Sequence, residues 1–418
     1  MLKKIPVSEV QVGMFLHELA GTSWLKHPYW KSKFLISSEA ELDRLCQSTV
    51  THVWIDVALG ADVVPEPDAP ALPQAAAPEP EPPSAPKPPL PPLPPLPPLS
   101  LERAVEKASE IKKYAKLEIK ALYEQARLGH AITTAHLAPL VSDISESVLR
   151  NPGVLTSLSR LKHMDDYTYL HSVTVCALMV ALGQRLGLAD DELRVAGMAG
   201  LLHDVGKAAI PLHILNKPGK LTPEEFEVVK QHPRDGFDML AGESGASGEA
   251  SRDVALHHHE TINGRGYPEG LAGDQISLMA RMGAICDVYD AITSNRPYKA
   301  GWEPSQAVHS MAGWAKAGQF DQRIFEGFVR SVGIYPTGSL VRLQSGWLAV
   351  VLEQHPTSAL TPRIKVFFST AFKLYIVPQI VDLARPGNIE RIVGRELPET
   401  WGIDNLEALW TGLVASKG

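Results

Sequence analysis

A proline-rich tract early in the chain restricts the fold more than any other feature of the sequence. The stretch from Pro65 to Pro98 holds 17 of the 34 prolines in the 418 residues, and its end repeats Pro-Pro-Leu from Pro88 to Leu99. Proline fixes φ and lacks a backbone N–H, so this stretch can neither continue a helix nor complete a sheet ladder. The three-residue period is typical of polyproline II. We therefore expect a semi-rigid spacer over residues 63–100, with a ligand for an aromatic-lined groove as the alternative.

Residues 1–62, which precede the tract, are expected to form a small α+β module. The segments 10–16 and 51–57 alternate between apolar and polar side chains, and this pattern predicts strands. Ser38 and Glu41 have the spacing of a capping box, which predicts a short helix through Leu45. The sequence of the module shows neither a cluster of metal-binding residue types nor a glycine-rich phosphate loop. We expect it to regulate or assemble the protein through a signalling partner.

An amphipathic helix of roughly 28 residues is predicted after the tract, because apolar residues recur there at three- and four-residue steps. These residues are Ala108, Ile111, Ala115, Ile119, Leu122 and Ala126. Their shared face could form a homodimer through residues 101–130, or it could pack on the chain's own helices, and the sequence favours neither. Helical patterns continue to about Val332, which predicts an all-helical domain over residues 101–335.

Strand patterns replace helical ones in the last part of the chain. Alternating or apolar runs lie at 339–343, 347–352, 364–368 and 374–377, and Ser345-Gly346 between the first two is a hairpin signal. We expect a small β-rich appendage over residues 336–418. The predicted fold is therefore mainly α, with a small α+β module at one end and a β-rich appendage at the other.

Charge and composition exclude several classes of partner. The net charge of −7 argues against general binding to nucleic acid and to anionic membrane surfaces. No apolar run approaches the ~20 residues of a membrane span, and the N-terminus lacks the apolar region of a signal peptide. Cys46, Cys176 and Cys286 are odd in number and far apart in the sequence, as expected for reduced thiols. We predict a soluble, cytoplasmic protein.

Side chains that commonly bind metals recur through the predicted helical domain. They are His171, the pair His203-Asp204, His232, the pair His258-His259, and Asp287. A single histidine on an apolar helix would most often be an ordinary core residue, but several segments that each offer a ligand predict a divalent-metal site. Asp204 could bridge two cations with its two oxygens. Lys207, expected one helical turn after His203 on the same face, could then receive a phosphate oxygen. The set predicts a metal site that cleaves phosphodiesters.

The order of these motifs resembles that of the HD-GYP domain, a branch of the HD metal-dependent phosphohydrolases. The resemblance extends from about Asp165 to Tyr298. It rests on four segments, 201–207, 232–236, 258–268 and 287–299. It implies an HD-type helical catalytic domain that hydrolyses cyclic di-GMP to pGpG and often on to GMP. The first 62 residues also resemble the small domain that often precedes HD-GYP domains in bacteria.

The resemblance assigns roles to individual residues. One metal would be held by His171, His203, Asp204 and Asp287, and a second by Asp204, His232, His258 and His259. Asp204 and Lys207 would be catalytic, with the two metals activating a hydroxide for attack at phosphorus. Substrate would be bound by Asp165, Lys207, Tyr267, Arg296 and Lys299, and Glu260 would orient a ligand histidine. Mixed imidazole and carboxylate donors favour iron or manganese over zinc.

Two positions depart from the family pattern. Asn263 replaces the aspartate that is usual in the loop after the histidine pair, which keeps hydrogen bonding but removes a charge. Tyr167 stands where some family members have a glutamate that binds a third metal, so we expect two metals. Two other functions remain as alternatives: a cyclic-dinucleotide-binding signalling protein with little turnover, and a phosphodiesterase for another cyclic dinucleotide.

Overall fold

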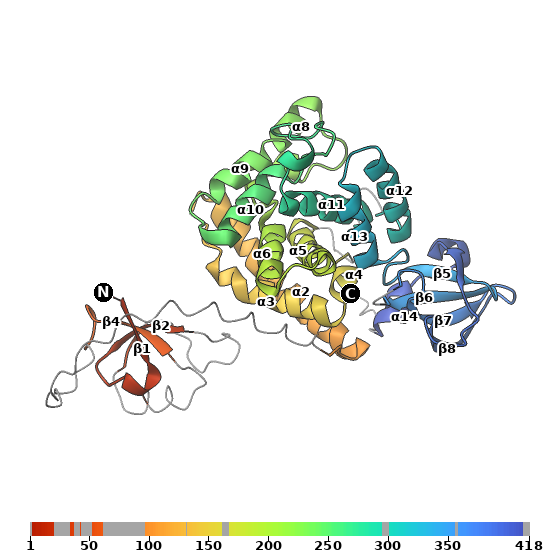
Figure 1. The fold of residues 1–418 in the computed structure, drawn as a ribbon, viewed down its shortest axis with the longest axis horizontal. Helices are drawn as coiled ribbons and strands as arrows, with labels where there is room; N and C mark the ends of the chain where they lie inside the picture. Colours follow the sequence, from red (N-terminus) through yellow and green to blue (C-terminus); the bar gives the residue numbers. More distant parts are fainter. Residues whose placement is uncertain are drawn as a thin grey trace, which may run out of the picture. The chain divides into compact units, whose positions relative to one another are not determined.

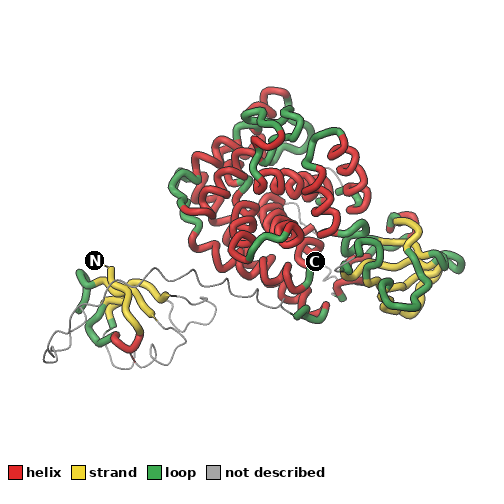
Figure 2. The backbone as a smooth tube through the Cα atoms, viewed as in Figure 1, coloured by secondary structure: helices red, strands yellow, loops and turns green. Residues whose placement is uncertain are grey.

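The computed structural model describes residues 2–20, 34–36, 42, 52–61, 97–130, 132–160, 167–294, 301–355 and 358–412. The chain divides into two compact units, Met1–Pro92 and Leu93–Gly418. Helices dominate the second unit up to α13, while strands predominate in the described residues of the first unit and at the C-terminal end of the second (Figures 1 and 2). The expected fold class, mainly α with a small module at each end, is confirmed. Four expectations lie outside the described residues: most of the helix at 38–45, the proline tract up to residue 96, the residue Asp165, and the pair Arg296 and Lys299.

The first unit contains an antiparallel sheet of four strands in the order β1-β4-β2-β3. The strands are β1 Leu2–Pro6, β2 Phe15–Ala20, β3 Phe34–Leu35 and β4 His52–Asp56. The predicted strand at 51–57 is confirmed as β4, but a strand over 10–16 is wrong, because β2 begins only at Phe15. Val10 and Met14 lie in a turn that contains Gly13 at φ +97°, and their side chains point into the core. Apolar residues therefore alternate in this segment although it is not a strand.

The second unit begins with twelve helices in its described residues. They are α2 Leu101–Arg127, α3 Ala138–Arg150, α4 Val154–Arg160, α5 Tyr167–Leu186, α6 Asp190–Leu202, α7 Leu212–Leu215, α8 Pro223–Val229, α9 His232–Met239, α10 Gly245–His257, α11 Leu278–Thr293, α12 Pro304–Lys316 and α13 Gln322–Val332. Helix α5 lies at the centre, in contact with α2, α3, α4, α6, α11 and α13 (Figure 1). Its residues from Leu170 to Val180 are buried on every side, which is why its sequence is apolar all round.

Ser100 caps the N-terminus of helix α2, because its hydroxyl accepts a hydrogen bond from the backbone N–H of Arg103. The six apolar residues that predicted it are all buried, in a core shared with α3, α4 and α5. In the structure, the apolar face of α2 therefore packs on helices of the same chain. The segment before α2 is also held in this unit, because Leu99 and Asn151 exchange two hydrogen bonds of 3.0 Å.

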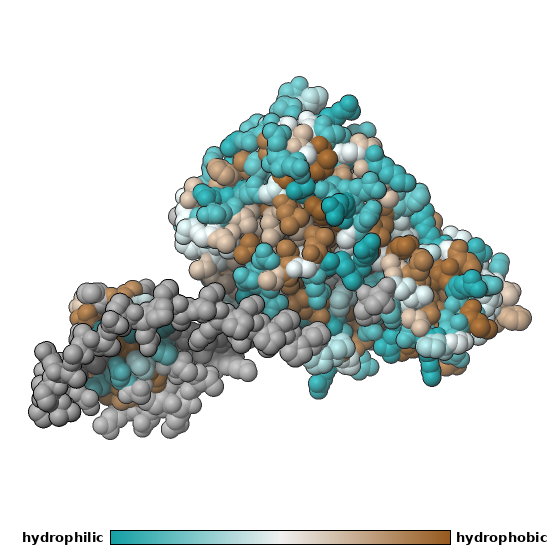
Figure 3. Space-filling model, in the orientation of Figure 1, coloured by the Kyte–Doolittle hydropathy of each residue, from teal (hydrophilic) through white to brown (hydrophobic). Residues whose placement is uncertain are grey.

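An antiparallel sheet of five strands in the order β8-β7-β6-β5-β9 follows the helices. The elements are β5 Leu340–Leu343, β6 Trp347–Glu353, β7 Arg363–Ser369, β8 Leu374–Asp382 and β9 Ile392–Arg395, and a short helix, α14 Leu406–Thr411, ends the described chain. Leu348 and Phe367 join the core that contains α2, while Val351 and Ile364 belong to a separate core of the sheet. Apolar side chains remain exposed on the edge strand β8, including Val377 and Ile380, and Figure 3 shows brown surface over this part of the molecule.

None of the helices in the described part of the chain has both the length and the apolar character that a membrane crossing requires.

Candidate metal centre

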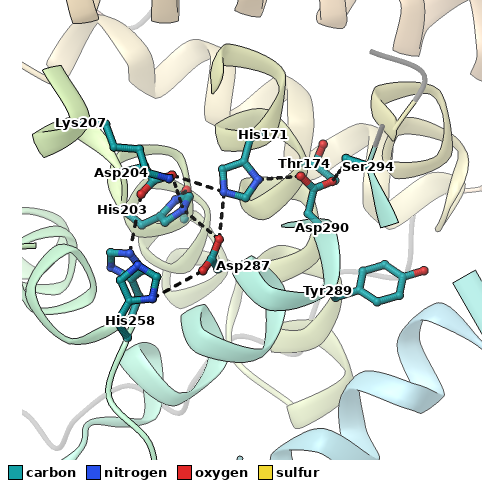
Figure 4. Close-up of polar contacts among 12 residues, drawn as sticks. His171, Thr174, His203, Asp204, Lys207, His258, Asp287, Tyr289, Asp290 and Ser294 are labelled. Carbon is teal, nitrogen blue, oxygen red and sulfur yellow. Dashed lines mark hydrogen bonds and ion pairs between the residues drawn. The ribbon is translucent and has the colours of Figure 1, made fainter. Parts of the chain in front are cut away.

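The side chains expected to bind metals come together inside the helical part of the second unit (Figure 4). His171 lies in the second turn of α5, and Asp287 lies in the middle of α11. The other expected ligands lie at helix ends. His203 and Asp204 follow α6, His232 is the first residue of α9, and His258 and His259 follow α10. All of these residues are buried except His259, which is intermediate.

The chain does not continue as an α-helix from His203 to Lys207, so the expected shared helix face is wrong. Helix α6 ends at Leu202, and Val205–Ala209 form a 3-10 helix. This tighter turn lets Gly206 lie against the backbone of α9, where an added Cβ would be 2.0 Å from the carbonyl oxygen of His232. The Lys207 ammonium consequently contacts Asp204 Oδ2.

Hydrogen bonds to backbone carbonyls determine the tautomer of three histidines. The Nδ1 atoms of His203, His232 and His258 lie 2.8, 2.7 and 3.0 Å from the carbonyl oxygens of Gly200, Val229 and Val254. A carbonyl oxygen can only accept a hydrogen bond, so each Nδ1 must carry the hydrogen. When one of these rings is neutral, its Nε2 atom presents a lone pair to the interior of the site.

Asp290 orients His171 in the same manner. Asp290 Oδ2 lies 2.6 Å from His171 Nδ1, and Asp290 Oδ1 accepts a hydrogen bond of 3.0 Å from the Ser294 hydroxyl (Figure 4). Asp290 is fully buried on α11, one helical turn after Asp287. A carboxylate in this position is the usual partner of a metal-binding histidine. Sequence reasoning assigned Asp290 no role, although its spacing of three residues from Asp287 was a signal.

The two carboxylate oxygens of Asp204 face two different groups of imidazoles. Oδ2 lies 3.4 Å from His171 Nε2 and 3.3 Å from His203 Nε2. Oδ1 lies 3.3 Å from His232 Nε2 and 3.7 Å from His258 Nε2. We call His171, His203 and Asp204 the first ligand group and His232, His258 and His259 the second ligand group. Within each group the potential ligand atoms lie within 4.8 Å of one another.

Asp287 also faces both groups. Its Oδ1 atom lies 2.9 Å from His171 Nε2, and its Oδ2 atom lies 3.9 Å from Nδ1 of His259. Sequence reasoning had placed Asp287 with the first ligand group alone. Its second oxygen gives the site another carboxylate that spans the two groups.

Burial and charge together keep the carboxylates ionised and two histidines neutral. Burial opposes ionisation of Asp204, but the Lys207 and His203 charges hold the pKa of Asp204 well below its usual range. The pKa of Asp287 is likewise well below its usual range, because the contacts of Asp287 with His171 and His203 outweigh burial. Burial, followed by the positive charges of neighbouring histidines, lowers the pKa of His258 well below its usual range. The pKa of His259 falls to about 3, mainly because of burial.

The donors present fit divalent cations. His203 Nε2 and Asp204 Oδ1 are buried and have no hydrogen-bond partner among the described residues. His232 Nε2 and His258 Nε2 lie only 3.2 Å apart, and the tautomers above place a lone pair on each. Two lone pairs at this distance repel unless a cation lies between or beside them. Neutral imidazoles, together with ionised carboxylates, are the ligands that first-row divalent metals prefer.

Tyr267 lies beside the second ligand group. Its ring stacks on that of His259, with centroids 4.7 Å apart and an interplanar angle of 25°. Glu260 holds the loop that carries Tyr267, because Glu260 Oε1 accepts hydrogen bonds of 2.7 and 3.0 Å from the backbone N–H groups of Glu269 and Gly270. The expectation that Glu260 orients a ligand histidine is wrong, because its hydrogen bonds go to this loop.

Asn263 closes the same loop without a charge. Its Oδ1 atom accepts hydrogen bonds of 2.8 Å from the Thr261 hydroxyl and 3.2 Å from the backbone N–H of Arg265. Its amide nitrogen donates to the carbonyl oxygen of Ala317 at 3.5 Å, which an aspartate could not do. Asparagine therefore suits this loop. Tyr167 is the first residue of α5, and its side chain lies outside the described atoms.

Comparison with known proteins gives matches over the whole chain. Residues 140–324 match the model of the HD domain, and residues 2–137 match a domain of unknown function (DUF3391). The chain is 52% identical over 422 residues to the cyclic di-GMP phosphodiesterase PA4108 of Pseudomonas aeruginosa, covering 100% of this chain and 98% of that protein.

Two further relatives match over shorter lengths. The cyclic di-GMP phosphodiesterase response regulator RpfG of Xanthomonas campestris is 40% identical over 195 residues, which are 46% of this chain and 50% of that protein. The 3′3′-cGAMP-specific phosphodiesterase 1 of Vibrio cholerae is 33% identical over 185 residues, which are 44% of this chain and 42% of that protein.

Proposed function

We propose that this chain, which belongs to the HD-GYP branch of the HD-domain family, is a metal-dependent phosphodiesterase that hydrolyses cyclic di-GMP to linear pGpG and onward to GMP. The relative that matches it from end to end is named a cyclic di-GMP phosphodiesterase. The observation that carries the proposal is the Asp204 carboxylate, whose two oxygens each face a separate pair of buried imidazole nitrogens. One residue in this position can serve two cations at once.

The site would hold two divalent ions, iron or manganese in preference to zinc. His171, His203, Asp204 and Asp287 would hold one ion, and Asp204 would share the other with the second ligand group. Support comes from the donor set, since imidazole and carboxylate ligands in this number suit higher coordination than the four ligands usual for zinc. When bound, such ions lower the pKa of a water molecule and offset charge that develops on a phosphoryl group.

Lys207 and Tyr267 would act on the substrate from the protein side. The Lys207 side chain is 22% exposed and places its positive charge next to Asp204. From there its ammonium group could also contact a phosphate oxygen of the substrate. Burial raises the pKa of Tyr267 above its usual value, so its hydroxyl stays protonated and can donate a hydrogen bond to a phosphate oxygen. By their resemblance to the family pattern, Asp165, Arg296 and Lys299 would complete the contacts to the nucleotide.

The test is direct hydrolysis by the purified full chain under reducing conditions. Cyclic di-GMP is incubated with the protein and Mn²⁺ or Fe²⁺, and the products are separated by chromatography. We expect pGpG followed by GMP from the unaltered chain and neither product from Asp204→Ala. Asp274→Ala serves as the matched control, because the Asp274 side chain is fully exposed and lies outside both ligand groups.

Two outcomes would contradict the proposal. Metal-loaded protein that binds cyclic di-GMP but forms no product would favour a binding role with little turnover. A kcat/KM higher for 3′3′-cGAMP than for cyclic di-GMP would transfer the assignment to the substrate named for the Vibrio cholerae relative.

A further inference from the structure

Helix α2 contributes to the metal centre although it lies outside the residues that match the HD domain. That match begins at residue 140, whereas α2 spans Leu101–Arg127 and falls within the match to the domain of unknown function. In the structure α2 belongs to the helical unit, Leu93–Gly418, and contacts α3, α4 and α5. The boundary between the two family matches therefore separates α2 from the 3-10 segment Val205–Ala209, with which it is in contact.

The side chain that reaches from α2 to the site is Tyr123. Its hydroxyl donates a buried hydrogen bond of 2.9 Å to the backbone carbonyl oxygen of Asp204. Its ring packs edge-on against Tyr169, with centroids 5.8 Å apart, and Tyr169 lies two residues before His171 on α5. Tyr123 is thus in contact with the segments that carry two members of the first ligand group.

The segment that follows Asp204 is held from the same side. The Asp204 carbonyl oxygen also accepts a hydrogen bond of 2.9 Å from the backbone N–H of Lys207. Arg127, one turn after Tyr123 on α2, donates from Nη1 to the carbonyl oxygen of Ile210 at 3.2 Å. Within the same segment, Gly206 lies against the backbone of His232. The 3-10 segment is therefore in contact with both α2 and α9.

We propose that Tyr123 is a positioning residue for the metal centre, and that the site is incomplete without α2. The inference rests on the two-metal site proposed above. The carbonyl held by Tyr123 and the carboxylate that faces both ligand groups belong to the same residue, so a shift of this backbone displaces both carboxylate oxygens. Tyr123 consequently sets the affinity for metal and the rate of turnover, without touching either metal or substrate.

The test uses the full chain carrying Tyr123→Phe, which removes the hydroxyl and keeps the ring. Partners of this kind typically contribute about 10- to 100-fold to metal affinity. We expect Mn²⁺ binding, measured by competition with a fluorescent chelator, to weaken by about that factor. We also expect kcat at saturating Mn²⁺ to fall while KM for cyclic di-GMP stays the same. The matched control is Tyr114→Phe, the same change at a half-buried position nearer the start of α2.

A second control separates the hydrogen bond from general loosening of α2. Ile119→Val removes one methylene from the same buried face and leaves the hydroxyl in place. If Ile119→Val weakens Mn²⁺ binding as much as Tyr123→Phe at an equal loss of melting temperature in the metal-free protein, the proposal is overturned. If Tyr123→Phe prevents folding, Arg127→Met tests the same segment from an exposed residue. Weakened Mn²⁺ binding in that variant supports the proposal, and unchanged binding contradicts it.

The metal readout also keeps this inference distinct from the proposed activity. An unaltered chain that binds Mn²⁺ but leaves cyclic di-GMP intact would refute the activity, while a weaker affinity in Tyr123→Phe would still support the positioning role. A Tyr123→Phe chain whose Mn²⁺ affinity lies within twofold of the unaltered chain would overturn the inference, whatever its substrate. A chain that binds no Mn²⁺ at all would overturn both.

Discussion

Each ligand imidazole of the first ligand group is oriented by an acceptor outside the site. His203 donates from Nδ1 to the carbonyl of Gly200, three residues earlier, and His171 donates to Asp290. The two acceptors differ in charge, and this difference bears on the pKa of His171. The carbonyl of Gly200 is uncharged, whereas His171 lies among three carboxylates, those of Asp204, Asp287 and Asp290.

The titration of His171 gives the first prediction. Burial alone would lower the pKa of His171, but hydrogen bonds with the three carboxylates outweigh burial and raise the pKa to about 10 in the metal-free protein. Because a metal ligand must be unprotonated, binding of Mn²⁺ at pH 7 should release about one proton per chain from His171. Calorimetry in two buffers of different ionisation enthalpy measures this proton. An enthalpy independent of the buffer would contradict the prediction.

The same raised pKa predicts how the metal-free protein responds to pH. The stabilisation from protonated His171 is fully present below pH 6.5, its ordinary pKa, and is lost as the pH rises through about 10. The melting temperature of the metal-free chain should therefore fall between pH 7 and pH 10. A His171→Gln chain, which cannot gain this charge, should lose less stability over the same range.

Gly206 provides a prediction about packing. A Cβ at this position would lie 2.0 Å from the carbonyl oxygen of His232 and 2.4 Å from the backbone nitrogen of Gly236, both atoms of α9. Gly206→Ala must therefore push α9 away, at a cost of about 1–3 kcal/mol in the free energy of unfolding. Because His232 moves with α9, we also expect Mn²⁺ content to fall. Gly242→Ala, where an added Cβ meets no atom within 4 Å, is the control.

The ligand side chains could be predicted from the sequence because their residue types and order form recognisable motifs. Gly206 and Tyr123 could not be assigned in this manner, and only the spacing of Asp290 from Asp287 hinted at a role for Asp290. Their roles depend on atoms distant in the sequence: a ring on α5, a backbone on α9 and a carbonyl after α6. A motif specifies which atoms can bind a metal, but the supporting contacts are known only once the helices are packed.

At the scale of elements, periodicity predicted the long helix well and the short turn badly. Helix α2 has a regular apolar stripe over many turns, and its bounds follow from that stripe. The residues after α6 carry no such repeat. Their 3-10 geometry follows from the close contact of Gly206 with α9. The α9 residues in this contact, His232 and Gly236, lie twenty-six and thirty residues later in the chain. The contact of Lys207 with Asp204 was missed for this reason.

The loop over residues 261–270 gives a prediction at this scale. Glu260 is buried and accepts hydrogen bonds from two backbone N–H groups of the loop that carries Tyr267. Glu260→Ala leaves these donors without their acceptor, at a cost of about 1–3 kcal/mol. We expect kcat/KM for cyclic di-GMP to fall at least about tenfold, since Tyr267 is no longer held in position.

Metal content should change much less in Glu260→Ala, because the hydrogen bonds of Glu260 go to the loop. Mass spectrometry of bound metal, run beside the kinetics, separates the two effects. Glu249→Ala, at an exposed residue of α10, should leave both unchanged. Equal losses of metal and activity in Glu260→Ala would show that the loop supports the ligands directly.

At the scale of the whole molecule, the two units of the chain should differ in their contribution to chemistry. All of the expected metal ligands belong to Leu93–Gly418. A chain that begins at Pro97 retains α2 and the hydrogen bonds between Leu99 and Asn151. We predict that it keeps kcat/KM within about twofold of the full chain. A chain that begins at Leu101 should melt at a lower temperature, because it lacks those hydrogen bonds. If the chain that begins at Pro97 folds but loses all hydrolysis, the first unit is part of the catalytic apparatus.

The division of the chain around the proline tract could be predicted from composition, since proline excludes regular structure on chemical grounds. The role of α2 could not be predicted from the sequence. An apolar helix face has the same residue pattern whether it packs on a second copy of the chain or on helices of its own chain. Strand β9 was also missed. Its Ile392–Arg395 segment is short and only partly buried, so it has little apolar alternation to detect.

Anomalous diffraction from crystals of the Mn²⁺- or Fe²⁺-loaded chain, recorded at the absorption edge of the metal, shows directly how many ions the site holds and where they lie. We predict two peaks about 3.5–4 Å apart, one on each side of the Asp204 carboxylate. One peak should lie among His171, His203 and Asp287, and the other within the second ligand group. No peak is expected beside Tyr167, because a phenol with a pKa of ~10 stays protonated near neutral pH and is a poor ligand. A single peak, or a third peak of equal height, would contradict a site that holds two metal ions.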